Sequence, residues 1–336
     1  MAGPDGSRRL NMAALAPGIP LEMVTLLDGA GIDVVLPPSR DQPGVHAVLA
    51  DADVVLADWS GALRLGAEEA AFTRGVGYIQ NAGVGTDSID LDAWGTAGVP
   101  VAATAGANAT GVAEWCIAAA LSVLRSMNWA DSEVRAGRWP QLEASERGCG
   151  ELSGRRVGIV GFGDIGTRCA ALFAAFGSEV SYWSRRRRSA EEERGATWRE
   201  LDDLIARSSI LVLVVPLTED TRGLLDPGRL ARMPRGAIVV NAGRGGLVDE
   251  EALIAALDSG ALGGAALDVF ATEPLAPGSP LRSNDRVLLS PHIAGATAES
   301  RMRIFTMIAG NLSRAMRGEP LEGVVNGAPP LVRWRR

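Results

Sequence analysis

The sequence predicts an α/β protein with two domains, each built around a parallel sheet. The chain has 336 residues, 47% of them hydrophobic, and is longer than one ordinary compact core requires. Short apolar runs alternate with segments whose apolar residues recur at helical spacing, as in β–α–β units. In the middle of the chain, a glycine-rich turn joins one such run to a helical segment. Together these observations favour doubly wound sheets.

The first hundred residues contain a small α/β unit. Residues 1 to about 10 are polar, and we expect them to be frayed. Beyond them we predict strands at 32–36, 54–57, 78–80 and 99–102, separated by helical segments such as 21–28 and 91–97. The loop 81–87 follows a strand and is rich in glycine, so its N–H groups can gather around an anion. Taken alone, this loop fits an ordinary turn equally well.

A long helix is predicted next, followed by a long polar segment. Residues 110–128 have helical spacing, and Asn108 is a candidate N-cap. Residues 129–154 are polar, and the segment is long for a loop in a compact domain. We therefore expect an arm that packs on a partner subunit, most simply in a homodimer.

The centre of the chain has the pattern of a dinucleotide-binding turn. Residues 157–160 read as a buried strand that runs into Gly161, Gly163 and Gly166, and a helical pattern follows. The first glycine permits a tight turn, the second permits close approach of a pyrophosphate, and the third permits close packing of helix on strand. Asp164 and Ile165 stand where the helix begins, and its N–H groups would bind phosphate. A purely structural turn is the alternative.

The cofactor is predicted to be NADP(H) in preference to NAD(H). The strand 179–183 ends where NAD-binding proteins place an acidic residue that accepts a hydrogen bond from the ribose. Here Ser184 has that position, and Arg185 and Arg186 begin a run of four arginines. Guanidinium groups favour a 2′-phosphate. The alternative is a solvated basic loop balanced by the glutamates at 191–193.

Polar or conformationally special residues follow each strand in the second half of the chain. We predict strands at 210–215, 237–240, 263–267 and 287–289, and a final helix at 298–317. Ligands bind at the carboxyl ends of the strands in an open parallel sheet, so the residues after these strands should converge on one crevice. They are Pro216, residues 241–244, Asp268 and residues 290–292. The basic tail 332–336 has no partner that the sequence identifies.

Three of the residues at this edge suggest hydride transfer to a 2-oxo acid. The chain has two histidines, and His292 follows a predicted strand at the edge that should hold the nicotinamide. Glu273, beyond another strand end, can pair with it and fix its tautomer. Arg244, in a glycine-rich loop, offers a bidentate group for a carboxylate or carbonyl. His46 has no chemical neighbour in sequence, and we expect an ordinary histidine there.

These motifs closely resemble the D-isomer-specific 2-hydroxyacid dehydrogenase family, over residues from about 30 to 325. The matching segments are 83–90, 108–114, the glycine-rich turn, 215–221, 241–249, 267–274 and 291–295. The resemblance implies a Rossmann cofactor domain at 104–292, inserted in a smaller flavodoxin-like substrate domain formed by 1–103 and 293–336. It further implies that the long helices near 110 and 300 are the crossovers between the two domains.

The resemblance also implies a role for individual residues. Arg244 would bind the substrate carboxylate and keto oxygen, His292 would be the acid/base, and Glu273 would tune it. Val84 and Gly85 would donate N–H groups to the substrate carboxylate, and Trp59 would shape the substrate pocket, where its bulk departs from the family pattern. Asp268 would contact the nicotinamide carboxamide. Further cofactor contacts are expected from Val112, Pro216, Thr221 and Ala242.

Composition argues against several other classes. The net charge is −7 and the arginines are scattered outside 185–188, which disfavours nucleic-acid binding. Three cysteines without metal-ligand spacing indicate a reducing compartment and no metal site. We expect neither a signal peptide nor a membrane span, and therefore a cytoplasmic protein. The functional alternatives are a nucleotide-sensing regulator, a dehydrogenase of a phosphonate or inorganic anion, and a Rossmann methyltransferase.

Overall fold

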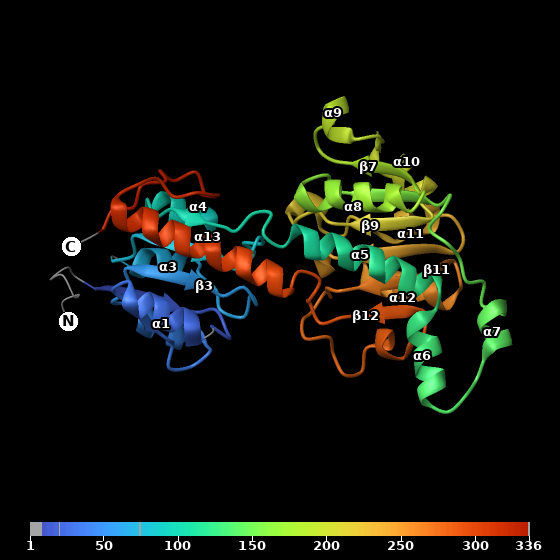
Figure 1. The fold of residues 1–336 in the computed structure, drawn as a ribbon, viewed down its shortest axis with the longest axis horizontal. Helices are drawn as coiled ribbons and strands as arrows, with labels where there is room; N and C mark the ends of the chain where they lie inside the picture. The colour runs from blue at the N-terminus through green and yellow to red at the C-terminus, as the bar shows by residue number, and fades with distance from the viewer. Residues whose placement is uncertain (1–8, 20, 74, 335–336) are drawn as a thin grey trace. The chain divides into compact units, whose positions relative to one another are not determined.

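The computed structural model describes residues 9–19, 21–73 and 75–334 (Figure 1). The chain divides into two compact units, which we call the outer unit, Met1–Ala107 with Arg301–Arg336, and the central unit, Asn108–Ser300. The boundaries differ from the predicted 103/104 and 292/293. Residues 293 and 294 stay with the central unit because their N–H groups donate to the Asp268 carboxylate. The change of unit falls just before α5 and within the first turn of α13.

The outer unit contains a parallel sheet in the order β2-β1-β3-β4-β5, the flavodoxin-like order. Helices α2, α3 and α4 pack on one face of this sheet, and α1 and α13 pack on the other. The strands are β1 (Leu10–Ala14), β2 (Ile32–Val35), β3 (Val54–Ala57), β4 (Tyr78–Asn81) and β5 (Val101–Ala102). The helices are α1 (Leu21–Gly29), α2 (Gln42–Leu49), α3 (Ala67–Phe72), α4 (Leu91–Thr96) and α13 (Ala298–Arg317).

Two features of the outer unit were not predicted. Strand β1 begins where the sequence suggested a frayed end, and it pairs with β2 on one side and β3 on the other. It was not predicted because Asn11 and three small or flexible residues give it a weak strand pattern. The tail does have a partner, since a Cβ on Gly77 would lie 2.8 Å from Val332 and 2.9 Å from Trp334. The C-terminal segment therefore packs on its own unit.

The central unit contains a seven-stranded parallel sheet in the order β12-β11-β10-β9-β6-β7-β8. Helices α5 and α8 lie side by side over one face, and α10, α11 and α12 cover the other (Figure 1). The strands are β6 (Arg156–Val160), β7 (Glu179–Trp183), β8 (Thr197–Trp198), β9 (Ile210–Leu213), β10 (Ala237–Asn241), β11 (Leu262–Leu267) and β12 (Val287–Leu289). The helices are α5 (Ala109–Leu124), α6 (Met127–Arg135), α7 (Gln141–Glu146), α8 (Asp164–Ala175), α9 (Ala190–Glu193), α10 (Leu201–Arg207), α11 (Pro227–Arg232) and α12 (Glu250–Asp258), with short 3-10 turns at Glu219–Thr221, Gly245–Leu247 and Pro280–Ser283.

The segment 129–154, which we expected to form an arm, contains helix α7 and most of helix α6. The long helix ends at Leu124, and Ser126, with φ 49°, breaks the chain direction before α6. None of the residues in α6 or α7 is buried, and the largely polar composition of the segment concealed both helices in the sequence. No helix among the described residues is long and apolar enough to cross a membrane.

Candidate active site

The glycine-rich turn lies where the strand order of the central sheet reverses, between β6 and β9. Gly161 has φ +104°, and a Cβ there would lie 2.8 Å from the Val214 carbonyl oxygen. At Gly166 a Cβ would lie only 2.0 Å from the Gly161 carbonyl oxygen. Both positions therefore require glycine for backbone reasons. Open sheets bind ligands at such a reversal of strand order.

The start of helix α8 suits a pyrophosphate. A Cβ on Gly163 would have no heavy atom within 4 Å, so this exposed position presents bare backbone to a ligand. Asp164 and Ile165 open the first turn of a 12-residue helix, whose leading N–H groups have no partner within the helix. The residues present thus fit the dinucleotide that the sequence predicts.

The four arginines after β7 fall into two pairs with different surroundings. Arg187 is 3.0 Å from a Glu193 carboxylate oxygen, and Arg188 is 3.6 Å from one of Glu192. Within the described part of the chain, Arg185 and Arg186 have no carboxylate partner, and both are exposed. The Ser184 hydroxyl donates to the Arg186 carbonyl and so shapes the turn. Of the four arginines, only Arg187 and Arg188 therefore form ion pairs with the glutamates that follow.

The remaining predicted cofactor contacts lie partly in loops at strand ends and partly in the hydrophobic core. Thr221 donates its hydroxyl to the Pro216 carbonyl at 2.8 Å, which fixes the loop after β9. Ala242 lies at the end of β10, where its N–H donates to the Leu213 carbonyl. Val112 is on the inward face of α5 and only 4% exposed in the hydrophobic core, and its contact with the cofactor stays a prediction. Its side chain offers almost no surface to a cofactor.

Asp268, at the end of β11, holds the loop that carries His292. Its carboxylate is 1% exposed and accepts hydrogen bonds from the Ser290 hydroxyl and from the Ile293 and Ala294 N–H groups, at 2.6 to 2.8 Å. Its carbonyl accepts from the His292 N–H at 2.8 Å. This gives Asp268 a structural role that the sequence did not reveal, and its contact with the nicotinamide stays a prediction.

His292 is held in an uncommon backbone conformation. Its φ is 55°, in the left-handed region, which costs a residue with a side chain on the order of 1 to 3 kcal/mol. The hydrogen bonds to Asp268 on both sides of the residue maintain it. As a result the imidazole, about half exposed, points its Nδ1 at a Glu273 carboxylate oxygen 2.9 Å away.

Glu273 is fixed by two hydrogen bonds. One carboxylate oxygen faces His292, and the other accepts from the Phe270 N–H at 3.0 Å. Burial alone would raise the pKa of Glu273, but the hydrogen bonds from His292 and Phe270 outweigh it and leave the pKa below its ordinary value. Glu273 is therefore a carboxylate at neutral pH and a hydrogen-bond partner of the imidazole.

Arg244 stands on a loop that is tightly held between two strand ends. Asn241, buried at the end of β10, donates its amide to the Arg244 carbonyl and accepts from the Gly243 N–H. A Cβ on Gly245 would lie 1.8 Å from the Phe270 carbonyl carbon, so only glycine allows the loops after β10 and β11 to approach so closely. Arg244 and Glu273 are thereby brought to neighbouring strand ends, and Arg244 also lowers the pKa of Glu273.

Replacement of Glu273 by Gln should change the pH dependence of 2-oxo acid reduction. The reaction that the sequence predicts takes a proton from His292, and a carboxylate beside an imidazole stabilises the protonated form of the ring. Without the charge, protonation is lost sooner as pH rises, so the alkaline limb of the pH profile of kcat/KM should move to lower pH. Glu250→Gln is the matched control, because Glu250 accepts from the Ala271 N–H in the same loop. Identical profiles for wild type and Glu273→Gln would remove Glu273 from the mechanism.

Three of the five predicted substrate contacts lie in the outer unit, and the other two, Arg244 and His292, lie in the central unit. Trp59 follows β3, and Val84 and Gly85 follow the adjacent strand β4. A Cβ on Gly83 would lie 3.9 Å from the Trp59 Cβ, so these two loops are neighbours. Trp59 and Val84 are exposed, and the Trp59 indole makes only a long hydrogen bond of 3.4 Å to the Pro17 carbonyl. Within this unit the structure brings the three residues together at one sheet edge.

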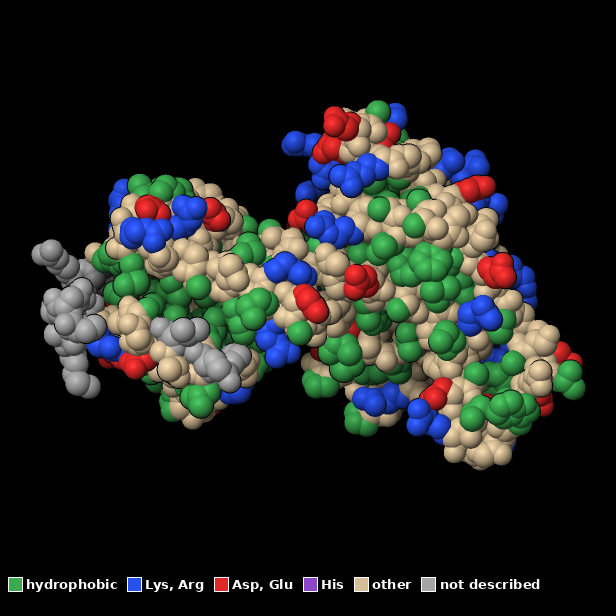
Figure 2. Space-filling view, viewed as in Figure 1, with side chains coloured by type: hydrophobic (Ala, Val, Ile, Leu, Met, Phe, Trp, Pro, Cys, Tyr) green, Lys and Arg blue, Asp and Glu red, His purple; other side chains and the backbone are tan. Residues whose placement is uncertain are grey.

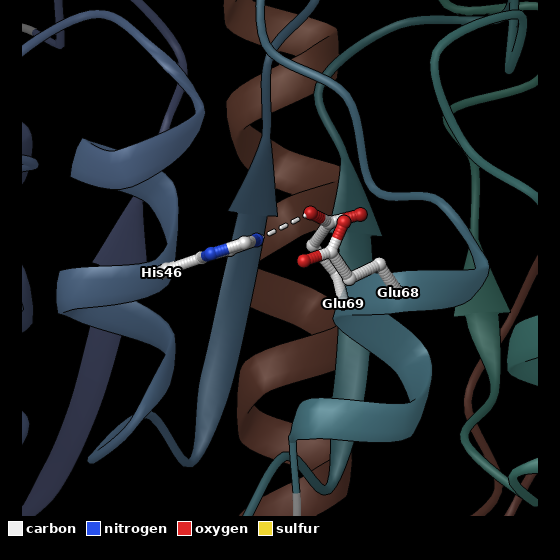
Figure 3. A group of neighbouring side chains, drawn as sticks. All are labelled: His46, Glu68 and Glu69. Carbon is white, nitrogen blue, oxygen red and sulfur yellow. Dashed lines mark hydrogen bonds and ion pairs between the residues drawn. The ribbon is translucent and has the colours of Figure 1, made fainter.

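His46 does have a chemical neighbour, contrary to our expectation. Its Nε2 lies 2.6 Å from an oxygen of the buried Glu69, and Glu68 is close by (Figure 3). Both oxygens of Glu69 are already engaged, since Gln42 donates to the same oxygen as His46 and the Gly66 N–H donates to the other. We therefore interpret this group as a link between α2 and α3.

Similarity to known proteins identifies the family of this chain. The fold and the strand-end residues define a dinucleotide-binding dehydrogenase, and residues 117–294 match the D-isomer specific 2-hydroxyacid dehydrogenase, NAD binding domain. The glyoxylate reductases of Aeropyrum pernix and Thermofilum pendens are 41% and 36% identical, over 72% and 88% of this chain and 74% and 88% of their own. D-3-phosphoglycerate dehydrogenase of Mycobacterium leprae is 36% identical over 89% of this chain and 56% of its own.

Solved structures show the same fold along nearly the whole chain. A putative D-isomer specific 2-hydroxyacid dehydrogenase from Polaromonas has a TM-score of 0.85 and 30% identity, covering 94% of this chain and 99% of its own. D-mandelate dehydrogenase from Rhodotorula graminis has a TM-score of 0.87 and 26% identity, covering 97% and 100%. The chain belongs to the D-isomer specific 2-hydroxyacid dehydrogenase family. Its central unit is accordingly a nicotinamide-dinucleotide domain.

Proposed function

We propose that the protein reduces a small 2-oxo acid to the D-2-hydroxy acid, or catalyses the reverse oxidation, with NADP(H) preferred over NAD(H). The observation that carries this proposal is the 2.9 Å pair of His292 and Glu273. This pair stands beside the Arg244 loop, on the sheet that bears the dinucleotide turn. An acid and an anion-binding cation at neighbouring strand ends are what reduction of a carbonyl next to a carboxylate requires.

The residues divide the chemistry between them. Arg244 binds the substrate carboxylate and polarises the keto oxygen, and the N–H groups of Val84 and Gly85 are a second set of carboxylate donors. His292, oriented by its contact with the Glu273 carboxylate, gives a proton to the keto oxygen. When bound, the nicotinamide supplies the hydride. Positive charge from Arg244 and His292 stabilises the negative charge that develops on that oxygen.

The preference for NADP(H) rests on the first two arginines after β7. A 2′-phosphate at this position would meet the guanidinium groups of Arg185 and Arg186, which are not neutralised by carboxylates in the described structure. Ser184, unlike an aspartate, adds no negative charge there. Favourable charge at the site and the absence of a repelling acid both support the phosphorylated cofactor.

Turnover separates this function from its alternatives. We expect oxidation of NADPH on addition of glyoxylate, hydroxypyruvate, pyruvate or a branched or aromatic 2-oxo acid, with a slower reaction from NADH. A nucleotide-sensing regulator would bind the cofactor without consuming it. A dehydrogenase of a phosphonate or inorganic anion would instead reduce NADP⁺ in the presence of that anion and leave every 2-oxo acid untouched.

We also propose that α6 and α7 form the arm of a homodimer. Trp139 and Leu142 are 78% and 77% exposed, and Met127 and Val134 on α6 are exposed as well. Hydrophobic side chains, green in Figure 2, are visible on this part of the surface. Clustered exposed apolar side chains on helices without a buried face favour a protein partner, and a second copy of the chain would cover the same surface symmetrically.

Charged substitutions in the arm should dissociate the dimer. Trp139→Glu combined with Leu142→Glu would place four carboxylates in the interface, two from each subunit, beside arginines that are already paired with Asp131, Glu133 and Asp285. Light scattering after gel filtration should then give the mass of one chain of 35.0 kDa, against two for wild type. Leu21→Glu is the control, since Leu21 is 76% exposed but belongs to α1. A monomeric wild type would refute the dimer.

A further inference from the structure

The loop Gly83–Gly85 is shaped by the residue that ends β4. Asn81 is 1% exposed, in a strand that pairs with β3 on one side and β5 on the other. Its side-chain nitrogen donates to the Gly83 carbonyl at 3.0 Å and to the Gly85 carbonyl at 2.8 Å. Both amide protons of Asn81 are thus used on the loop that follows it. A buried side chain with this geometry fixes the orientation of two peptide groups.

The orientation of these two carbonyls decides where the neighbouring N–H groups point. In a trans peptide unit the C=O and the following N–H are antiparallel. The Gly83 carbonyl, which also accepts from the Thr104 N–H at 3.1 Å, is turned toward the protein, so the Val84 N–H is turned away from it. The same relation directs the Thr86 N–H away from Asn81.

These outward N–H groups are open to a ligand. Within the described residues, the backbone N–H groups of Val84, Gly85 and Thr86 have no backbone or side-chain acceptor. Val84 and Gly85 are exposed. Successive N–H groups that converge on one side of a loop form a concave anion site. Had the peptides flipped, carbonyl oxygens would face that side and repel a carboxylate.

We propose that Asn81 is the positioning residue of the substrate-carboxylate site and that the Thr86 N–H is a further donor in it. This inference rests on the proposed function, since it takes the anion to be the carboxylate of a 2-oxo acid. Asn81 does not touch the substrate. It acts through the loop, by holding two carbonyls inward so that N–H groups face the anion.

Two variants of Asn81 test this role. Asn81→Asp keeps the shape but replaces the donor with a carboxylate that repels both carbonyls, and Asn81→Ala removes the donor without adding charge. When the loop N–H groups no longer face the substrate carboxylate, charge-assisted hydrogen bonds to it are lost, so we expect KM for the 2-oxo acid to rise roughly tenfold to a hundredfold in both variants. The KM for NADPH should stay within about twofold, because that cofactor binds the central unit.

The matched control is Asn311→Asp. Asn311 is a buried amide of the same unit that donates to the Gln80 side chain and to the Glu322 carbonyl, and not to the two loop carbonyls that Asn81 holds. Its replacement should lower Tm and leave KM unchanged. A purely structural role for Asn81 would give this same pattern, whereas a positioning role raises KM selectively. If Asn81→Asp fails to fold, Asn81→Ala alone carries the comparison.

Oxamate binding keeps this test separate from that of the proposed function. Oxamate is an unreactive carboxylate of the shape of a 2-oxo acid, and calorimetry on the NADPH complex measures its affinity without turnover. We expect wild type to bind it and both Asn81 variants to bind it at least tenfold more weakly. Equal KM and equal oxamate affinity in folded variants, or no oxamate binding by wild type, would overturn the inference. A wild type that binds oxamate but reduces no 2-oxo acid would refute the proposed function alone.

Discussion

His292→Ala should lower kcat for 2-oxo acid reduction by about a hundredfold to ten-thousandfold, the range for loss of a positioned general acid. The side chain is the imidazole that Glu273 orients at 2.9 Å, and no other histidine lies in the central unit. The KM for NADPH should change little, because the dinucleotide turn at Gly161–Gly166 does not involve this residue. Steady-state kinetics with both substrates varied measures the two effects separately.

The other histidine supplies the control for this experiment. His46 pairs with Glu69 in the outer unit, and His46→Gln should leave kcat within about twofold of wild type while lowering Tm, because the link between α2 and α3 is weakened. A kcat for His292→Ala close to that of wild type would show that the proton comes from another group, and would remove His292 from the mechanism.

The double variant Arg185→Ala, Arg186→Ala should lose NADPH affinity by roughly thirtyfold to a thousandfold. Each guanidinium contributes about 1 to 2 kcal/mol in a charge-assisted hydrogen bond to phosphate, and the sum of the two contributions gives this range. NADH lacks the 2′-phosphate, so its KM should barely change. The preference should therefore invert or disappear in this variant.

The next two arginines form a matched control. Arg187 and Arg188 are paired with Glu193 and Glu192, so their replacement by Ala removes the same charge from the same loop without removing an unpaired guanidinium. We expect at most a few-fold change in the KM for NADPH. Wild-type preference for NADH, or equal losses for both cofactors in the Arg185/Arg186 variant, would mean that this run is only a solvated surface loop.

The sequence predicted those features that short-range patterns encode. Glycine is required at 161 by the positive φ and at 166 by the close approach of the backbone, and the spacing of the two glycines predicts the turn. Strands such as β10 and β12 are continuous apolar runs, and polar residues directly after them stand at the edge where ligands bind. For this reason His292, Glu273 and Arg244 were identifiable as a group before any geometry was known.

Features that depend on contacts distant along the chain were missed. Asp268 and Asn241 hold their loops through hydrogen bonds to backbone groups, and the presence of an Asp or Asn in a sequence does not indicate such a role. The burial of Val112 depends on how the core packs around α5, and the spacing of apolar residues in a helix does not show this packing. Strand β1, with its short and weakly apolar pattern, gains its stability from two neighbouring strands.

The most direct test of the central claim is chiral analysis of the product that wild-type protein forms from a 2-oxo acid and NADPH. Hydroxypyruvate, pyruvate and a branched 2-oxo acid give distinguishable products, and the amount of NADPH consumed is measured in the same sample. We expect the D-2-hydroxy acid, formed in equal molar amount to the NADPH oxidised. Formation of the L-isomer, or no 2-hydroxy acid from any 2-oxo acid with either cofactor, would contradict the function proposed for this site.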